Sequence, residues 1–321
     1  MIKTIVIYNR HALKRKPRHS IEEVGKALLS AGIDHVMISP MKSGETIELV
    51  EAAVRDGTER VICTGGDGTV NEVVNGVVRA EKNGAARAAI GILPNGRGND
   101  FGYAVGIPQD LQRSIAIIAA GHLRRVDVGR VYNGLCERYF MNGAGVGIDA
   151  AINYWATLSS LNGFPSYAWG LLKALSRNYV QPVMRVRIDG ASFEKPVVML
   201  AAMNGLREGG GFQLAPDFDL QDGLLNVSII GDGLPLRRVL PIIPSFFNGT
   251  VAQQKIVHRY LARKIEVEIP DRGLIGQADG EVLGTAIRSF RAEIDGDSID
   301  LIVPKVSTRS EERRVGKECR S

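Results

Sequence analysis

The chain of 321 residues is short of several features that would place it in a specialised class. Its three cysteines, Cys63, Cys136 and Cys319, show no metal-ligand spacing, so we expect neither a disulfide framework nor a cysteine-bound metal. No apolar run is long enough to span a bilayer, and we expect no signal peptide because Lys3 leads straight into a strand pattern. Hydrophobic residues nevertheless make up 45% of the chain, which argues against disorder, and size and composition agree with a cytoplasmic protein that has two cores.

The chain also lacks a G-x-x-x-x-G-K-[ST] phosphate loop, but another glycine-rich turn follows a predicted strand at 60–64. The turn and the start of the next predicted helix, near Thr69, read Gly65, Gly66, Asp67, Gly68, Thr69, Val70, Asn71 and Glu72. Glycines let backbone N–H groups approach an anion, and the positive end of the helix points the same way. These residues therefore form a candidate phosphate-binding turn. A purely steric turn is the alternative, although it does not require Asp67 or the Asn71-Glu72 pair.

A second glycine-rich segment follows the apolar run at 88–93. It reads Pro94-Asn95-Gly96-Arg97-Gly98-Asn99-Asp100-Phe101, and its candidate nucleotide-binding residues are Gly96, Arg97 and Asn99. Right-handed crossovers between parallel strands place both turns at strand carboxyl ends, where open α/β sheets bind ligands. We therefore expect the nucleotide to lie against both turns.

Two further blocks occur in the second half of the chain. A glycine-rich stretch at 203–212 leads to Asp219, Asp222-Gly223 and Leu224, and a separate block reads Gln277-Ala278-Asp279-Gly280-Glu281. By its residues alone, Asp222-Gly223 is typical of a hairpin turn. The carboxylates of Asp279 and Glu281 can both face a cleft, whereas on an exposed turn they would be solvated and inert.

Together these four blocks resemble the diacylglycerol kinase catalytic-domain family, bacterial lipid kinases that are similar to eukaryotic sphingosine and ceramide kinases. The first block in shorter form also occurs in NAD kinases and phosphofructokinases, whereas the Asn99-Asp100-Phe101 element resembles lipid kinases alone. Arg97 stands where the family has threonine or serine, and Asn95 where it has leucine. An arginine can bind phosphate oxygens in a bidentate manner, and a solvated loop arginine is the alternative.

The resemblance implies ATP as the nucleotide and Mg²⁺ as a structural metal. The metal ligands would be the main-chain carbonyls of Asp219 and Leu224 and the carboxylate of Asp222, with waters completing an octahedron. It also implies that Glu281 accepts the proton of a lipid hydroxyl and that Asp279 is its charged neighbour. We add Asp67 to the catalytic residues, since its carboxylate is expected to face metal and phosphate.

The pattern of elements predicts two domains with a cleft between them. Residues 1–125 alternate strands and helices, as in a doubly wound, Rossmann-like α/β domain, and a segment at about 297–306 is expected to return to it. Residues 126–296 carry short β-like runs, which suggest an antiparallel β-sandwich with helices inserted at 150–177 and 236–248.

Aromatic and basic residues in these inserted helices suggest contact with a membrane or an acyl chain. The residues concerned are Tyr154, Trp155, Phe164, Tyr167, Trp169, Leu171, Leu172 and those at 236–247. Ordinary core packing is the alternative. We expect a lipid substrate at a membrane surface, peripheral membrane contact and no nucleic-acid partner; a homodimer is compatible with the sequence.

The sequence therefore predicts an ATP-dependent lipid kinase, with diacylglycerol as the first candidate acceptor and phosphatidylglycerol and sphingoid bases left open. An NAD kinase is the second interpretation, and Asn99-Asp100-Phe101 argues against it. The third is a degenerate nucleotide-binding regulatory protein, which Arg97 and the family-atypical Asn9-Arg10-His11 suggest. Intact Asp67, Glu72 and Glu281 argue against that.

The last thirteen residues, 309–321, match the translation of a common sequencing-adapter DNA in one reading frame. We interpret them as an assembly artefact. Without their five basic and three acidic residues the formal net charge falls from +5 to +3. Independent amplification of the genomic DNA that still encodes them in frame would refute this.

Overall fold

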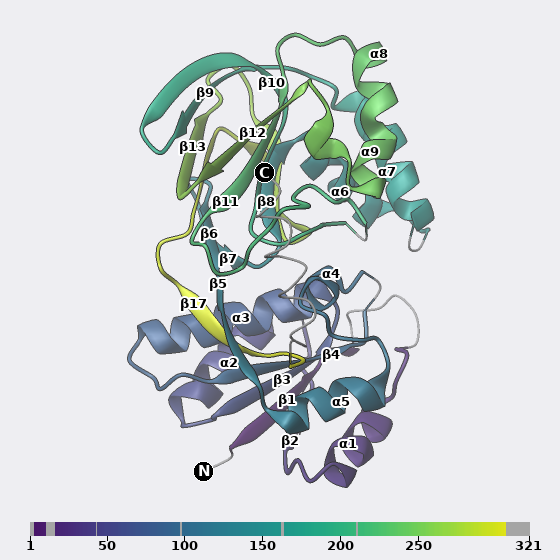
Figure 1. Ribbon diagram of the computed structural model, residues 1–321, viewed down its shortest axis with the longest axis vertical. Helices are drawn as coiled ribbons and strands as arrows, with labels where there is room; N and C mark the ends of the chain where they lie inside the picture. The colour runs from purple at the N-terminus through teal and green to yellow at the C-terminus, as the bar shows by residue number, and fades with distance from the viewer. Residues whose placement is uncertain are drawn as a thin grey trace, which may run out of the picture.

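The computed structural model describes residues 3–10, 17–42, 44–96, 98–161, 164–209 and 211–305. Two domains follow one another along its long axis, an α/β domain that holds the N-terminus and a β-rich domain (Figure 1). This arrangement confirms the predicted combination of a doubly wound domain and an antiparallel β-sandwich.

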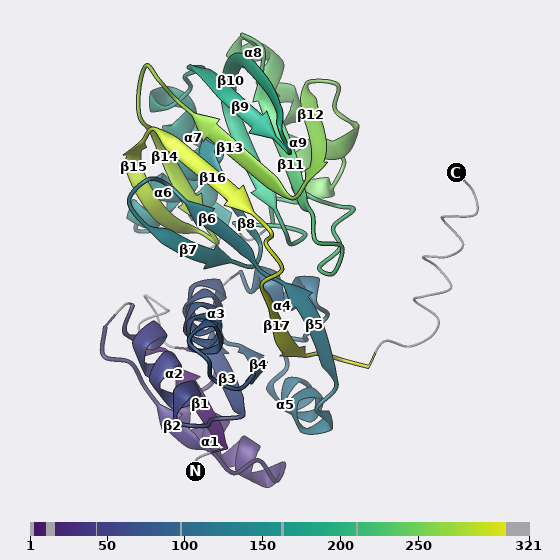
Figure 2. The same cartoon turned by 90° about the vertical axis from the view of Figure 1, so that its left-hand side faces the viewer.

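A six-stranded sheet forms the centre of the first domain, in the order β2 (Val36–Ile38), β1 (Thr4–Tyr8), β3 (Arg60–Gly65), β4 (Ala89–Pro94), β17 (Ser298–Ile302) and β5 (Leu123–Asp127). The first five strands are parallel, and β5 runs antiparallel to β17. Strand β17 comes from the far end of the chain, so the chain crosses back after completing the second domain (Figure 2).

Helices cover both faces of this sheet because its strands carry apolar side chains on both faces. The helices are α1 (Ile21–Ser30), α2 (Glu45–Arg55), α3 (Asp67–Lys82), α4 (Asp100–Ala104) and α5 (Leu111–Ala120). Helices α1 and α5 pack on Val6 and Ile62, whereas α2 and α3 pack on Ile7 and Cys63. The predicted capping box is present, since Ser20 and Glu23 exchange both hydrogen bonds.

Eleven antiparallel strands form the second domain. They are β6 (Gly129–Tyr132), β7 (Glu137–Phe140), β8 (Gly143–Gly147), β9 (Val183–Ile188), β10 (Ala191–Met203), β11 (Leu225–Gly231), β12 (Val257–Ala262), β13 (Lys264–Glu268), β14 (Leu274–Ala278), β15 (Glu281–Ile287) and β16 (Ser289–Glu293). Strand β10 pairs with β9 in its first half and with β8 and β11 in its second half. Its register shifts between Val197 and Met199, where one layer of the sandwich passes into the other.

The two layers enclose a core that includes Phe140, Val186 and Phe290. A layer of helices covers the opposite side of β8, β10 and β11. It comprises α6 (Ile148–Leu158), α7 (Phe164–Arg177), α8 (Leu236–Val239), η2 (Leu240–Ile242), α9 (Ile243–Asn248) and η3 (Val251–Gln253). The predicted helix at 236–248 is thus broken into short pieces, and Pro241 and Pro244 lie at the breaks, where a proline cannot donate a helical hydrogen bond.

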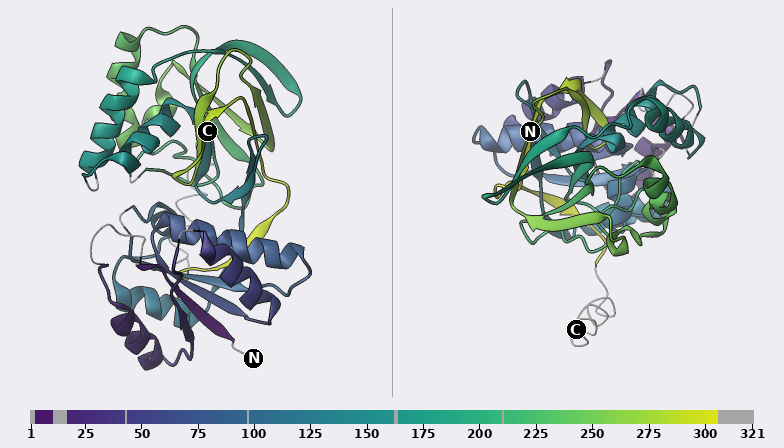
Figure 3. Two further views of the ribbon diagram at one scale, coloured as in Figure 1. Left: turned by 180° about the vertical axis from the view of Figure 1, so that it is seen from behind. Right: turned by 90° about the horizontal axis from the view of Figure 1, so that it is seen from above.

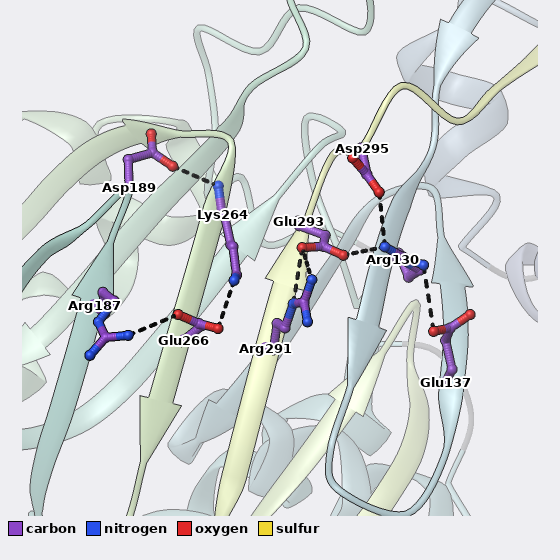
Figure 4. Close-up of polar contacts among 9 residues, drawn as sticks. All are labelled: Arg130, Glu137, Arg187, Asp189, Lys264, Glu266, Arg291, Glu293 and Asp295. Atoms are coloured by element: carbon purple, nitrogen blue, oxygen red, sulfur yellow. Dashed lines mark hydrogen bonds and ion pairs between the residues drawn. The ribbon is translucent and has the colours of Figure 1, made fainter.

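Charged side chains occupy the outer face of the sheet formed by β9, β13, β16, β6 and β7 (Figure 4). Glu266 lies between Arg187 and Lys264, at 3.7 and 2.7 Å, and Glu293 lies between Arg291 and Arg130. Arg130 also contacts Glu137 and Asp295. The pairs of Glu266 are partly exposed and contribute about 0–1 kcal/mol each, whereas Glu293 is buried, and its two arginine partners compensate its charge.

Candidate active site

The two glycine-rich turns lie against each other at the carboxyl ends of β3 and β4. The backbone N–H of Asn95 donates to the carbonyl of Gly65 at 2.9 Å. A Cβ atom on Gly96 would lie 2.3 Å from the Cα of Gly66, and one on Gly65 would lie 2.4 Å from Oγ1 of Thr69. Close packing therefore already requires glycine at both positions, against the backbone of Gly66 at 96 and against the side chain of Thr69 at 65, whatever the turns bind.

Helix α3 begins at Asp67, two residues earlier than the sequence predicted. Its N-cap residue is Gly66, which has no side chain to bond the first-turn N–H groups. The helix end thus offers free backbone donors beside the two turns, which is the usual geometry of an anion site.

Several predicted nucleotide-binding residues have structural partners. Val70 packs in the hydrophobic core, and Glu72 accepts from the backbone N–H of Gly44 at the start of α2. Asn99 has a left-handed backbone (φ 49°), and its side chain bonds both the N–H and the carbonyl of Gly96, which closes the second turn. Arg97, the predicted phosphate contact, lies outside the described residues.

Two carboxylates lie beside the turns, that of Asp67, which is half-buried, and that of Asp100, which is buried. Oδ1 of Asp67 accepts from the backbone N–H of Phe101 at 3.0 Å. Burial raises the pKa of Asp67 to about 7, and the charge of Asp100 adds to the effect. Arg207, which comes from the second domain, pairs with Asp100 at 2.8 Å and stacks 3.8 Å from the ring centre of Tyr103. Sequence analysis did not find Arg207, since one basic residue within a glycine-rich stretch carries no recognisable signal.

Asp279 and Glu281 are two residues apart but have opposite surroundings. Asp279 is buried, with a left-handed backbone (φ 47°), and its carboxylate accepts four hydrogen bonds. The donors are Nδ2 of Asn71 and the backbone N–H groups of Met141, Asn142 and Gly143, at 2.7–3.1 Å. Glu281 is exposed, and its Oε1 lies 3.1 Å from the position of a Cβ on Gly68. Asp279 therefore ties α3 to the second domain, while Glu281 faces the nucleotide turn with a free carboxylate.

The predicted metal residues lie in the loop before β11. Leu224 N–H donates to Oδ1 of Asp222, and Gln221 N–H donates to Oδ1 of Asp219. Sequence analysis missed Asp127, whose Oδ2 accepts from the N–H of Gly223 at 2.9 Å. Burial raises the pKa of Asp127, and the charges of Asp222 and Asp219 raise it further. Across the described residues, no three His, Cys, Asp or Glu side chains are arranged to hold a metal ion. The predicted set relies on two carbonyls and remains a prediction.

An apolar pocket lies between the helical layer and the sandwich. Its walls come from α6, α7, α9 and β10, and include Ile152, Leu171, Met199 and Phe246. Tyr167 and Leu171 line this pocket and also pack on the neighbouring core. The pocket fits the predicted contact with an acyl chain, and the core contacts fit the alternative of ordinary core packing.

Four polar side chains, Asp149, Asn153, Glu208 and Gln277, line the same pocket. Both carboxylate oxygens of Asp149 are buried, and neither makes a hydrogen bond of normal geometry with a described group. Burial raises the pKa of Asp149 to about 7 despite the nearby Ala150 N–H and Gln277 amide. Burial and the charge of Asp149 also raise the pKa of Glu208, which accepts from the N–H of Gly280 at 3.1 Å. Sequence analysis missed both carboxylates, because neither belongs to a recognisable spacing.

Comparisons with known proteins agree with this architecture. Residues 3–131 match the model of the diacylglycerol kinase catalytic domain, and residues 143–303 match the YegS C-terminal NAD kinase beta sandwich-like domain. A solved putative diacylglycerol kinase from Bacillus anthracis aligns with a TM-score of 0.73 at 20% identity, over 94% of this chain and 97% of that one. An ATP-bound NAD kinase from Archaeoglobus fulgidus aligns with a TM-score of 0.52 at 12% identity, over 93% of each chain. At these identities the likeness concerns the fold alone.

Curated relatives are more similar in sequence. A probable YegS-like lipid kinase of Chromohalobacter salexigens is 37% identical over 64% of this chain and 65% of its own length. A second probable YegS-like lipid kinase, from Pectobacterium atrosepticum, is 31% identical over 85% of this chain and 87% of its own. A diacylglycerol kinase of Staphylococcus carnosus is 30% identical over 70% of this chain and 71% of its own. With both domains matched and these relatives covering most of its length, the chain belongs to the diacylglycerol kinase catalytic-domain family of lipid kinases.

Proposed function

We propose that this protein transfers the γ-phosphoryl group of ATP to the hydroxyl group of a lipid, with diacylglycerol as the first candidate acceptor and phosphatidic acid as its product. Membership of a kinase family implies the use of ATP. The name of the Staphylococcus carnosus relative and the apolar pocket both support a lipid acceptor. The choice among diacylglycerol, phosphatidylglycerol and a sphingoid base is a matter for experiment.

The observation that carries the proposal is the position of three consecutive residues, Asp279, Gly280 and Glu281. Asp279 binds Asn71 of α3, Gly280 donates to Glu208 in the apolar pocket, and Glu281 reaches the nucleotide turn beside Gly68. One short turn therefore connects the candidate nucleotide site with the candidate acceptor site. A reaction between a nucleotide phosphate and a lipid hydroxyl needs such a junction.

In the proposed reaction, the lipid oxygen forms a bond to the γ-phosphorus of ATP as the bond from that phosphorus to the β,γ-bridging oxygen breaks. The hydroxyl proton passes to the carboxylate of Glu281, and ADP leaves with the bridging oxygen. Backbone N–H groups at the start of α3 are positioned to hold phosphate oxygens. Buried Asp279 keeps the turn that carries Glu281 in place through its four hydrogen bonds.

The loop at 219–224 fits a bound Mg²⁺ in its chemistry. Its donors are oxygens, and a divalent cation would neutralise the charges of Asp222 and Asp219, which add to the effect of burial on the pKa of Asp127. When bound, Mg²⁺ would stabilise this loop, and a nucleotide-bound Mg²⁺ would neutralise phosphate charge.

The test is transfer of ³²P from γ-labelled ATP into a total lipid extract, with NAD as acceptor in a parallel tube and the Glu281→Gln protein as the control. We expect a labelled lipid whose formation the control lacks. Labelled NADP would instead identify an NAD kinase. Label in neither acceptor, with folded protein and several Mg²⁺ concentrations, would favour a regulatory protein without kinase activity.

A further inference from the structure

The helical layer of the second domain differs from the rest of the chain in its charge. None of the chain's 35 acidic residues lies between 150 and 188 or between 233 and 265, the two segments that contribute α6 from its third residue, α7, α8 and α9. The same segments contain Lys173, Arg177, Arg237 and Arg238 on or directly after these helices. Apart from Asp149, whose carboxylate oxygens are buried at the start of α6, the charged residues of this layer are therefore all basic.

Large apolar side chains are exposed on the same layer. Five of the fourteen exposed large hydrophobic side chains of the described residues belong to it. We call them the helical patch: Leu158 (61% exposed), Leu161 (46%), Trp169 (42%), Leu172 (64%) and Leu240 (45%). The side chain of Phe164, which the sequence also suggested for this surface, lies outside the described residues. In the views of Figures 1 and 3 these helices form one flank of the domain, opposite the β9–β10 hairpin.

Cations and aromatic rings are arranged in pairs on this flank. Nζ of Lys173 lies 4.7 Å from the ring centre of Trp169, and the guanidinium of Arg177 lies 5.4 Å from the ring centre of Trp155. Arg237 and Arg238 are exposed on α8. Aromatic rings paired with basic side chains, beside exposed leucines, are typical of segments that lie in the interface of a bilayer.

The opposite flank shows that this charge pattern is not general to the domain. On the sheet of β9, β13, β16 and β6, Glu266 and Glu293 lie between basic side chains (Figure 4). That face is balanced in charge. The helical patch is apolar, and the charged residues beside it on α7 and α8 are all basic.

We propose that the helical patch is a docking surface for an anionic lipid bilayer, with the exposed leucines and Trp169 inserted among the lipids and Lys173, Arg237 and Arg238 at the headgroups. The proposal rests on the proposed function, since the bilayer would hold the acceptor lipid. Helices α7 and α9 also supply Leu171 and Phe246 to the inner pocket. A lipid that leaves the bilayer would therefore meet apolar walls on the inner side of the same helices.

Charge also favours a bilayer over a second copy of this chain. In a twofold dimer formed through the helical patch, each patch would face an identical one. Lys173, Arg237 and Arg238 would then lie opposite other cations with no acidic residue of these helices between them, which is unfavourable. Anionic lipids present the opposite charge.

The test is co-sedimentation of the full chain with phosphatidylcholine vesicles that contain either no phosphatidylglycerol or about a third of it, without ATP. We expect binding to the anionic vesicles only, weakened by salt. Leu172→Glu should weaken the partition coefficient at least about tenfold, since it replaces an inserted apolar side chain by a charge. Arg237→Glu should weaken it at least about fivefold. Leu123→Glu, at a leucine of similar exposure (58%) on β5 of the other domain, is the matched control and should bind normally.

Two outcomes would overturn the proposal. One is equal binding of Leu172→Glu, Leu123→Glu and the parent protein when their melting temperatures agree. The other is a parent dimer that Leu172→Glu converts to monomer while vesicle binding stays the same, which would assign the patch to a second copy. Because the assay involves no turnover, vesicle binding without lipid phosphorylation would leave the docking surface standing and refute only the proposed function. Leu172→Glu should also phosphorylate a short-chain, water-dissolved acceptor at the parent rate.

Discussion

The candidate nucleotide site and the candidate acceptor pocket are built from different parts of the chain. At the candidate nucleotide turns the close packing of the backbone matters: a Cβ on Gly96 would overlap the backbone of Gly66, and one on Gly65 would overlap the side chain of Thr69. At the acceptor pocket the side chains matter, because apolar walls from several helices surround the carboxylates of Asp149 and Glu208. The first site depends on close packing that only glycine permits, and the second on carboxylates that are surrounded by apolar side chains.

This difference predicts how each site responds to substitution. Adding one methyl group at Gly96 should damage the nucleotide turns, because the atoms it would meet are backbone atoms of Gly66 and cannot move aside. In the pocket, neutralising a carboxylate should be tolerated by the fold and can even stabilise it, because a buried charge without strong partners opposes folding. The turn at Asp279, Gly280 and Glu281 connects the two sites, since Asp279 bonds Asn71, Gly280 bonds Glu208 and Glu281 lies beside Gly68.

The largest effect is expected at this junction. Glu281→Gln should lower kcat by about a hundredfold to ten-thousandfold, because the amide cannot accept the hydroxyl proton, with little change in the KM for ATP. The melting temperature should not change, since Glu281 is exposed. Steady-state kinetics and thermal melting measure both quantities.

Asp279→Asn is the matched comparison, and its defect should lie in stability. Its NH2 group would face either the donors of Asn71 and Met141 or those of Asn142 and Gly143, at a cost of about 1–3 kcal/mol for each unsatisfied group. We expect a lower melting temperature. If Glu281→Gln kept full turnover, or if Asp279→Asn melted with the parent, the separation of a proton acceptor from a structural neighbour would be wrong.

The next effect concerns the nucleotide turns. A Cβ in Gly96→Ala would lie 2.3 and 2.8 Å from backbone atoms of Gly66, so one turn must move. A displacement of this size typically costs about a hundredfold in rate. In the control, Gly102→Ala, the new Cβ would lie 3.7 Å from Pro94, which is ordinary contact, and activity should be retained. Equal activities of the two variants would contradict a rigid paired turn.

The sequence predicted that the two glycine-rich turns lie at strand ends, as they do, but it pointed to few of the residues that line the pocket. Gly65, Gly66 and Gly96 follow buried strands directly, so their positions at strand ends could be deduced from local pattern. The pocket draws Asp149, Glu208 and Gln277 from three segments far apart in the chain, and only tertiary packing brings them together. For the same reason the sequence named Asp279 and Glu281 but could not tell which of them is buried.

A smaller and conditional effect is expected at the loop before β11. If Asp222 binds a structural Mg²⁺, Asp222→Asn should lower activity about tenfold at limiting Mg²⁺ and recover as Mg²⁺ is raised, because a weakened site fills at higher concentration. Glu281→Gln should not recover. Mg²⁺ titrations of both variants provide the comparison, and a crippled Asp222→Asn that ignores Mg²⁺ would remove Asp222 from the metal site.

The smallest effect on activity, together with a gain rather than a loss of stability, is expected at Asp149. Its pKa is raised from 3.8 to about 7 in the folded protein, so the folded state holds its proton more tightly than the unfolded state does. Stability should therefore fall as pH rises from about 4 to about 7 and then level off, by at most about 4 kcal/mol from this group. An asparagine side chain cannot ionise, so Asp149→Asn should melt above the parent near pH 8 and with it near pH 4, while phosphorylation of a lipid acceptor slows a few-fold.

Asp232→Asn is the control of opposite direction. Although burial alone would raise the pKa of Asp232, its partners His258 and Lys195 lower it, so its contribution is present above the ordinary carboxyl pKa and is lost as pH falls. Asp232→Asn should therefore melt below the parent at neutral pH. Thermal melts of the three proteins at several pH values decide the matter. If the melting temperature of Asp149→Asn equalled that of the parent at every pH, the carboxylate of Asp149 would not destabilise the folded protein. The pocket would then not be a site of unfavourable buried charge, and its contrast with the glycine-rich turns would be wrong.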